Sequence, residues 1–250
     1  MKWNRTTILW TVLACFFVTN ALLAEFIGIK IFSLESSIGI PKANLKIGDA
    51  LLNFDLTAGV IIWPLVFILT DIINDYFGKR GVMVLSYITV FTLLLAFLFV
   101  NLIIHAEPSQ VWVENFKGNI NINNAFNAVF SQGLWIIIGS IVAFLVGQLI
   151  DAFIFDKIKR STKNKMIWLR ATASTIMSQF VDSYLVLFIA FYIGNDFELK
   201  WVLQIGTLNY IYKFLVCFAL IPLLYIIHFF IEKFLGKAKS EDLKKTALNQ

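Results

Sequence analysis

The chain has 250 residues, of which 59% are hydrophobic and 15% charged, and its mean hydropathy is +0.78. A soluble domain carries about 25% charged residues, so this composition excludes an ordinary soluble protein. The net charge of +5 does not indicate a nucleic-acid-binding protein, because most basic residues lie beside apolar runs and not in a separate basic domain.

Apolar runs long enough to cross a bilayer occupy most of the chain. A membrane-spanning helix needs about 20 apolar residues, and in lipid each span must satisfy its own backbone polar groups, which favours helices. Barrel strands would instead give alternating segments of roughly ten residues. The sequence predicts an all-α polytopic membrane protein with a single integral membrane domain over residues 1–250. Its six predicted spans are 6–29, 57–77, 82–104, 132–155, 169–193 and 203–230, followed by a basic tail at 232–250.

The basic residues predict the orientation of these spans. With a cytoplasmic N-terminus, 15 of the 21 Lys and Arg residues fall on the inside, in segments 2–5, 79–80, 157–170 and 233–245. Five fall on the outside, and Lys213 lies within the last span. By the positive-inside rule, both termini are cytoplasmic. The first span could imitate a signal peptide, but its apolar run continues past Ala24 without a good cleavage site, so we expect it to be retained.

The loops and the possible metal ligands are less informative. The first outside loop has turn signals around Gly39–Pro41 and is expected at the membrane interface, and the Asn-rich second loop is either an interfacial segment or a lid. Cys15 and Cys217 fall within predicted spans, so neither a disulfide framework nor a zinc cluster is expected. His105 and His228 lack ligand spacing and are interpreted as interfacial. No cofactor is predicted.

The fifth predicted span carries a polar stripe. Thr175, Ser178, Gln179 and Asp182 follow at intervals of three, one and three, which places them on one face of a helix. Interhelical hydrogen bonds explain the hydroxyl and amide groups. A charged residue at a helix centre costs about 2.5–3.5 kcal/mol on insertion scales, so a functional role is favoured for Asp182.

The last span carries Asn209 and Lys213, four residues apart on one face. Lys213 lies too deep to reach either membrane surface easily. We therefore expect it to pair with Asp182 in the neighbouring antiparallel helix. The pair could be architectural, or it could be a switch that substrate or proton binding opens, and the sequence leaves both readings open.

Two earlier spans also contain acids. Asp71 follows Pro64 in the second span, and Gln148 and Asp151 lie three residues apart in the fourth; a functional role is predicted for all three. Asp75 is interpreted as a solvated helix end. The ends of these two spans, 70–80 and 147–160, share two acids, an aromatic residue and then basic residues. This similarity fits either an internal duplication or the general chemistry of helix ends. Together these residues predict a polar pocket reached through the membrane.

Four motifs in this order resemble the queuosine precursor transporter family, also called the vitamin uptake transporter family: WPLVFILTDIINDYFGKR, GQLIDAFIFDKIKR, LRATASTIMSQFVDSYLVLFIAF and LNYIYKFLV. The resemblance covers the chain from about Asn20 to the end of the last span. It implies six helices, a multi-pass location in the bacterial inner membrane, and uptake of 7-deazaguanine bases. These are 7-cyano-7-deazaguanine, its 7-aminomethyl relative and, in some members, queuine.

The polar residues are chemically suited to such a base. Its N–H donors match carboxylates and amides, and its flat ring could stack on Phe180, Tyr184, Tyr210 or Tyr212. Lys213 would be the counter-ion of the acids, and proton coupling through one acid is left open. The predicted substrate-binding residues are Asp71, Gln148, Asp151, Gln179, Asp182, Asn209 and Lys213.

The sequence therefore predicts a secondary transporter whose partners are a 7-deazapurine base and membrane lipid, with no direct nucleic-acid partner. A homo-oligomer is left open. The first alternative is a substrate-binding membrane subunit of an ATP-driven uptake complex; any ATPase would be a separate chain, because no GxxxxGK[ST] loop occurs. An enzyme is not predicted, because HExxH and a clear Ser/His or Cys/His pairing are absent. A structural or receptor role is the remaining alternative.

Overall fold

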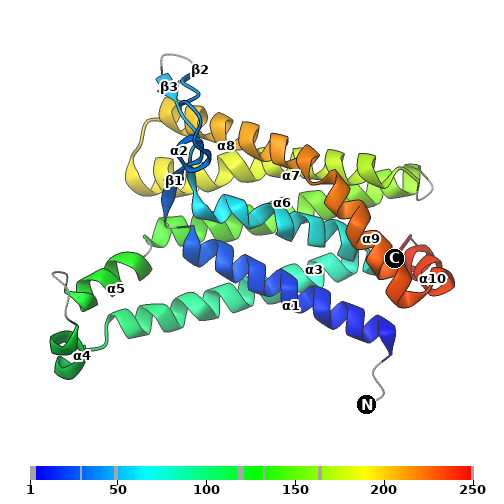
Figure 1. Cartoon of the computed structure of the whole chain (residues 1–250), viewed down its shortest axis with the longest axis horizontal. Helices are drawn as coiled ribbons and strands as arrows, with labels where there is room; N and C mark the ends of the chain where they lie inside the picture. Colours follow the sequence, from blue (N-terminus) through cyan, green and yellow to red (C-terminus); the bar gives the residue numbers. More distant parts are fainter. Residues whose placement is uncertain are drawn as a thin grey trace.

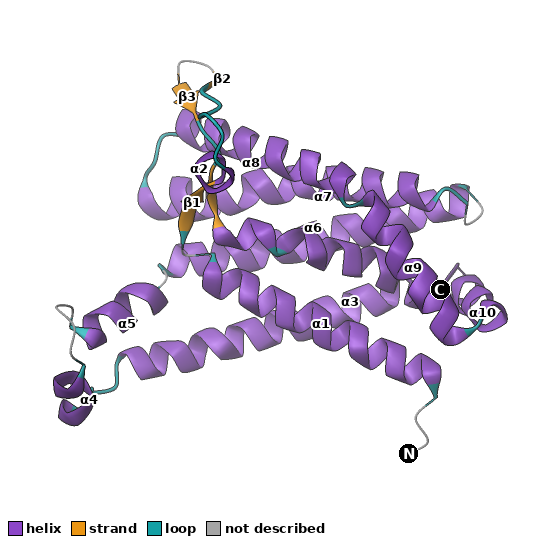
Figure 2. Ribbon diagram, in the orientation of Figure 1, coloured by secondary structure: helices purple, strands orange, loops and turns teal. Residues whose placement is uncertain are grey.

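The computed structural model describes residues 4–28, 30–47, 50–116, 121–131, 133–162 and 165–248, and most of them are helical (Figure 2). Within these residues, five helical segments are long and apolar enough to cross a membrane. The all-α, polytopic membrane class predicted from the sequence is therefore confirmed. The long helices lie side by side (Figure 1): α1 (Arg5–Ile27), α3 (Trp63–Ile104), α6 (Leu134–Ser161), α7 (Ile167–Leu187) and α8 (Leu199–Ala219).

The 42-residue helix α3 consists of two parts. Gly78 interrupts it with φ 73° and ψ 176°, a conformation that is open to glycine and strained for other residues. Residues 63–77 and 79–104 run in opposite directions on either side of this glycine (Figure 1). The two parts correspond to the predicted spans 57–77 and 82–104. A short 3-10 helix, η1 (Ala58–Ile61), precedes the first part.

The predicted last span, 203–230, is not one continuous helix. The chain ends α8 at Ala219 and begins α9 (Ile221–Leu235) in a new direction, with Pro222 in the first turn of α9. Proline lacks a backbone N–H and clashes with the preceding turn, which explains the break. The predicted basic tail is also helical: α10 (Lys237–Leu248) folds back and packs against α3.

The fifth predicted span also changes character near its end. α7 is followed by a π-helix, η2 (Phe188–Ile193). Together the two segments cover the predicted range 169–193, so the span is helical throughout, with a wider turn in its last third.

The loop predicted to be the first outside loop contains short strands that an all-α prediction does not include. β1 (Ile31–Ser33) pairs with β4 (Asp55–Thr57), and β2 (Leu45–Ile47) pairs with β3 (Ala50–Leu52), both antiparallel. The short helix α2 (Leu34–Ile38) lies between β1 and β2. The second outside loop forms α4 (Gln110–Asn115) and α5 (Ile122–Phe130), and its residues 117–120 lie outside the described part of the chain.

The main apolar core joins α1, both parts of α3, α6 and α9. Phe17, Ile72, Tyr76, Phe155 and Leu224 are among its buried members. This packing holds the first part of α3 against α6, and it directs the polar side chains of α3 toward α6 and α7. Many large apolar side chains outside the core remain exposed on the long helices, as expected for a surface that faces lipid.

Candidate functional site

A buried polar layer joins the first part of α3 to α6. The Thr70 hydroxyl donates to Gln148 Oε1 at 2.8 Å, and the Asn74 amide donates to the Ala152 carbonyl at 3.1 Å. All three polar side chains are fully buried. Gln148 Nε2 has no hydrogen-bond partner among the described residues. The layer therefore fixes the two helices together and still contains an unused donor.

Asp151 extends this layer to α7. Its Oδ1 accepts from the Ser178 hydroxyl at 3.2 Å and lies 3.5 Å from the Thr175 hydroxyl. Its Oδ2 has no hydrogen-bond partner within the described part of the chain, and the side chain is fully buried. The stripe of polar residues predicted on the fifth span thus faces α6 in part.

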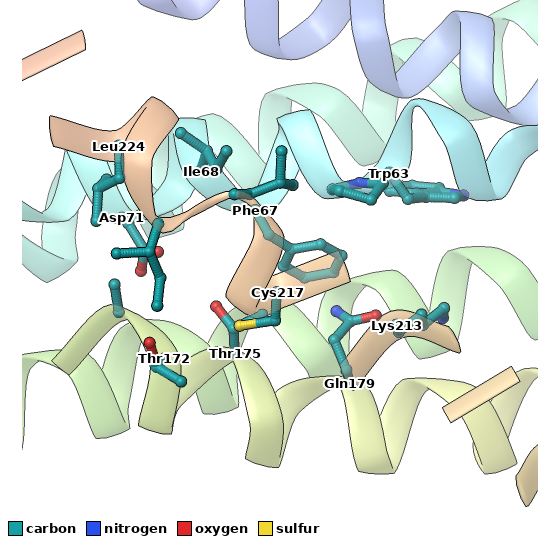
Figure 3. A pocket seen from close by; sticks show the side chains of 14 residues that line it. Trp63, Phe67, Ile68, Asp71, Thr172, Thr175, Gln179, Lys213, Cys217 and Leu224 are labelled. Carbon is teal, nitrogen blue, oxygen red and sulfur yellow. The ribbon is translucent and has the colours of Figure 1, made fainter. Parts of the chain in front are cut away.

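A cavity opens beside this layer, between α3, α7, α8 and α9 (Figure 3). Asp71 from α3 and Thr172, Thr175 and Gln179 from α7 face it, together with the apolar side chains of Trp63, Phe67, Ile68, Cys217 and Leu224. Its volume is about 40 Å³, which is room for roughly three water molecules.

Three side chains bring unused polar atoms to the cavity wall. Asp71 Oδ1, Gln179 Nε2 and Thr172 Oγ1 are buried and have no hydrogen-bond partner among the described residues. Leaving such atoms unpaired costs free energy in the folded protein. These atoms are therefore available to a polar ligand.

The predicted ion pair between the fifth and last spans is present. Lys213 Nζ lies 2.5 Å from Asp182 Oδ2, and both side chains are mostly buried. Lys213 also lines the cavity, close to Gln179 (Figure 3). The pair joins α7 to α8 at the edge of the cavity.

The structure does not bring all seven predicted site residues to one surface. Asp71, Gln179 and Lys213 line the cavity. Gln148 and Asp151 lie in the buried layer, and Asp182 pairs with Lys213. Asn209 is half-buried on α8 and is not among the cavity-lining residues.

The aromatic residues proposed for stacking are not those of the cavity. Phe180 and Tyr184 line a separate apolar groove between α7 and α8, where the Tyr184 hydroxyl lies 2.9 Å from Thr207 Oγ1. Tyr210 packs against Phe180, and Tyr212 does not line the cavity. Trp63 and Phe67 line it instead, and the stacking of the base on the other four aromatic residues stays a prediction. No local sequence pattern marks Trp63 and Phe67 as cavity residues, because the cavity forms only where four helices meet.

A second buried cluster surrounds Asp75, which sequence reasoning placed at a solvated helix end. That interpretation is wrong, because the side chain is fully buried. It lies within 4 Å of four basic side chains, two of them at short distances: Arg170 at 2.7 Å and Lys159 at 3.3 Å. The other two are Lys244 at 3.7 Å and His228 at 3.8 Å.

The Asp75 cluster connects five helices at one end of the bundle, because its members come from α3, α6, α7, α9 and α10. His228 is buried and stacks on Tyr76, with ring centroids 5.3 Å apart, so its interpretation as an interfacial residue is also wrong. Lys244 additionally bonds Glu232 at 2.9 Å. Burial alone would lower the pKa of Lys244, but Asp75 and Glu232 outweigh it and raise this pKa above its usual value.

Comparison with known proteins shows which family this chain resembles. Residues 57–227 match the family described as "Putative vitamin uptake transporter". The chain is 26% identical over 186 residues to a "Probable queuosine precursor transporter" of Bacillus subtilis (strain 168), which covers 73% of this chain and 77% of that protein. It is 26% identical over 171 residues to a "Queuosine precursor transporter" of Escherichia coli (strain K12), covering 67% and 70%. A "Probable queuosine precursor transporter" of Haemophilus influenzae is also 26% identical, over 66% of this chain and 64% of its own length.

No solved structure matches the chain. The family match spans more than half of the chain and includes every predicted site residue, from Asp71 to Lys213. The resemblance found in the sequence motifs is therefore confirmed, and the chain belongs to the vitamin uptake transporter family.

Proposed function

We propose that this chain imports queuosine precursors across the bacterial inner membrane, with 7-cyano-7-deazaguanine and 7-aminomethyl-7-deazaguanine as substrates and queuine as a further candidate. Three relatives are named for queuosine precursor transport. The observation that carries the proposal is the cavity, where unpaired buried polar atoms lie opposite aromatic rings inside a membrane bundle.

The cavity has the groups that a guanine-like base requires. Asp71 can accept from the N–H groups of the base, and the Gln179 amide can both donate and accept. Trp63 and Phe67 offer faces for the flat ring. In this proposal Gln148 and Asp151 support the wall from behind, and Lys213 keeps Asp182 neutralised at its edge. A bicyclic base is larger than the present cavity, so binding requires the surrounding helices to move apart.

We also propose six spans with both termini in the cytoplasm. The spans are α1, the two parts of α3, α6, α7 with η2, and α8 continued by α9. The start of α1, the turn at Gly78, the end of α6 and α10 lie at one end of the bundle, and the strands, α4 and α5 lie at the other (Figure 1). This arrangement gathers most of the basic segments at one end, as the positive-inside rule requires.

The same chain is proposed to transport the base alone, as a secondary transporter. The test is expression in a bacterium that lacks queuosine synthesis and its own precursor importer. Queuosine in its tRNA is then measured at limiting concentrations of each base. We expect 7-cyano-7-deazaguanine to restore the modification. Ranking the bases by the amount of queuosine that each restores gives the specificity.

Two variants make this test specific to the cavity. Asp71→Asn is expected to abolish restoration, whereas Asp156→Asn, in a surface pair with Arg160, is expected to retain it. A wild-type chain that reaches the membrane and restores nothing would contradict the proposal. Transport by the purified chain in liposomes without ATP would also exclude the need for a separate ATPase.

A further inference from the structure

The acids inside the bundle differ in their partners. Asp75 and Asp182 each lie within 4 Å of a basic nitrogen. Asp71 and Asp151 have no such ion pair among the described residues, although they are 4% and 0% exposed. A buried ionised carboxylate without a cation is expensive, and two neighbouring ones also repel each other, so one acid of this pair is expected to become neutral by binding a proton.

The surroundings of Asp151 favour this outcome. α7 presents the hydroxyls of Thr175 and Ser178, which are neutral. α3 presents Asp71, which is close enough to Asp151 to interact with it electrostatically. α8 presents the Cys217 thiol, which lies close enough to both acids to interact with them electrostatically.

The cations of the Asp75 cluster do not neutralise Asp151. Asp75 on α3 and Arg170 on α7 both interact with Asp71, and Arg170 is bonded to Asp75 at 2.7 Å. Lys159, on the same helix as Asp151, is also engaged with Asp75. Asp151 Oδ2 therefore remains an acceptor atom in a buried layer, with an acid nearby and no cation within ion-pair distance among the described residues.

We propose that Asp151 is a proton-binding site and that its proton enters the cell together with the base. This inference rests on the proposed function. The proton passes from the outer water to the Asp151 carboxylate and leaves to the cytoplasmic water, one proton for each base. With Asp151 neutral, Asp71 can stay ionised and accept the N–H groups of the base. Loss of the proton places two like charges in one buried layer, which destabilises the closed state around the base and favours its opening and the release of the base.

The experiment uses purified protein in liposomes and radiolabelled 7-cyano-7-deazaguanine, with the membrane potential clamped at zero by potassium and valinomycin. Exchange of labelled for unlabelled base at equal pH tests the proposed function. Uptake with the outside one pH unit more acid tests the coupling. One proton per neutral base predicts about tenfold accumulation at equilibrium, since one pH unit corresponds to about 1.36 kcal/mol.

Asp151 does not line the cavity, and an asparagine there imitates the protonated acid, so Asp151→Asn is expected to exchange the base without accumulating it. The matched control is Asp156→Asn, on the same helix but paired at 2.9 Å with the exposed Arg160, which is expected to accumulate the base like the wild type. Should Asp151→Asn not reach the membrane, the wild type still provides a test. Without an imposed pH gradient, inward flow of the base must acidify the lumen, and an unchanged lumen pH would overturn the proposal.

The outcomes separate the two proposals. Absence of exchange by the wild type refutes the proposed function, and the coupling with it. Exchange without accumulation under the pH gradient refutes only the coupling. Accumulation driven by a sodium gradient alone, or full accumulation by Asp151→Asn, also overturns the assignment of Asp151 as the proton site.

Discussion

Asp71 and Asp75 lie one helical turn apart on α3, yet within the described residues only Asp75 is held by cations. Arg170 and Lys159 neutralise Asp75 at the end of the bundle, whereas Asp71 presents an unpaired Oδ1 near the cavity. The same change at the two positions should therefore have different effects, one on stability and one on transport.

Asp75→Asn is expected to destabilise the protein strongly. The change leaves Arg170 and Lys159 buried without their carboxylate, and breaking a buried pair costs about 3–5 kcal/mol. Thermal unfolding in detergent measures the loss. Asp71→Asn is the matched control, because it removes an unpaired charge and should unfold at the wild-type temperature or above while losing uptake. Equal unfolding temperatures for Asp75→Asn and the wild type would contradict this account.

The pair of Asp182 and Lys213 can be tested by charge reversal. Asp182→Asn and Lys213→Met each leave one mostly buried charge alone, so both should lower the amount of protein in the membrane and reduce uptake at least tenfold. Exchanging the two residues should restore the protein level but not uptake, because Lys213 is part of the cavity wall. Recovery of uptake in the exchanged variant would show that the pair is only architectural.

Gly78→Ala should impair the reversal within α3. An alanine at φ 73° and ψ 176° is strained by about 1–3 kcal/mol, so the unfolding temperature should fall by several degrees. Gly133→Ala is the control, since its φ is −58° and a new Cβ would meet only Ile136 at 3.8 Å. An unfolding temperature of Gly78→Ala that matches that of Gly133→Ala would show that the turn does not require glycine.

The first outside loop should contribute a pH-dependent part of the stability. Burial opposes the charge of Glu35, but the N–H groups of Phe54 and Ala43 and the Ser33 hydroxyl outweigh it and lower its pKa below the usual 4.5. The ionised carboxylate therefore stabilises the fold above pH 4.5, and this contribution disappears as the pH falls through the lower folded-state pKa.

The measurement for Glu35 compares unfolding temperatures of the wild type and Glu35→Gln across pH. We expect the wild type to unfold at the higher temperature at pH 7, with the difference shrinking once the pH falls below 4.5. Glu114→Gln, in the second outside loop, serves as the control. A difference between wild type and Glu35→Gln that stays constant from pH 7 to pH 3 would contradict the role given to this carboxylate.

The spans could be predicted because their signals are local. The length of an apolar run decides whether a segment can cross a bilayer, and the Lys and Arg residues of the loops predict the orientation of the spans. The pairing of Asp182 with Lys213 was also predictable, because two deep opposite charges on neighbouring helices have few other partners. Pro222 was a readable signal for the break after α8 and was missed.

The burial of Asp75 could not be predicted in the same way. Its partners lie between 84 and 169 residues away along the chain and come from four other helices, so no local pattern contains them. The aromatic residues of the cavity could not be predicted for the same reason. Trp63 and Phe67 line the cavity because the first part of α3 lies beside α7, α8 and α9, which is a property of the assembled bundle.

The docking of α10 on Asp75 has a consequence for the biogenesis of this protein. Lys244 lies 169 residues after Asp75 in the chain, yet it supplies a cation to that carboxylate. The early helices can enter the membrane while the chain is still being translated, but the Asp75 cluster cannot be completed until α10 has left the ribosome. A translation arrest within α9 would thus yield a membrane-inserted intermediate with an incomplete ion-pair cluster, a natural substrate for membrane quality-control proteases.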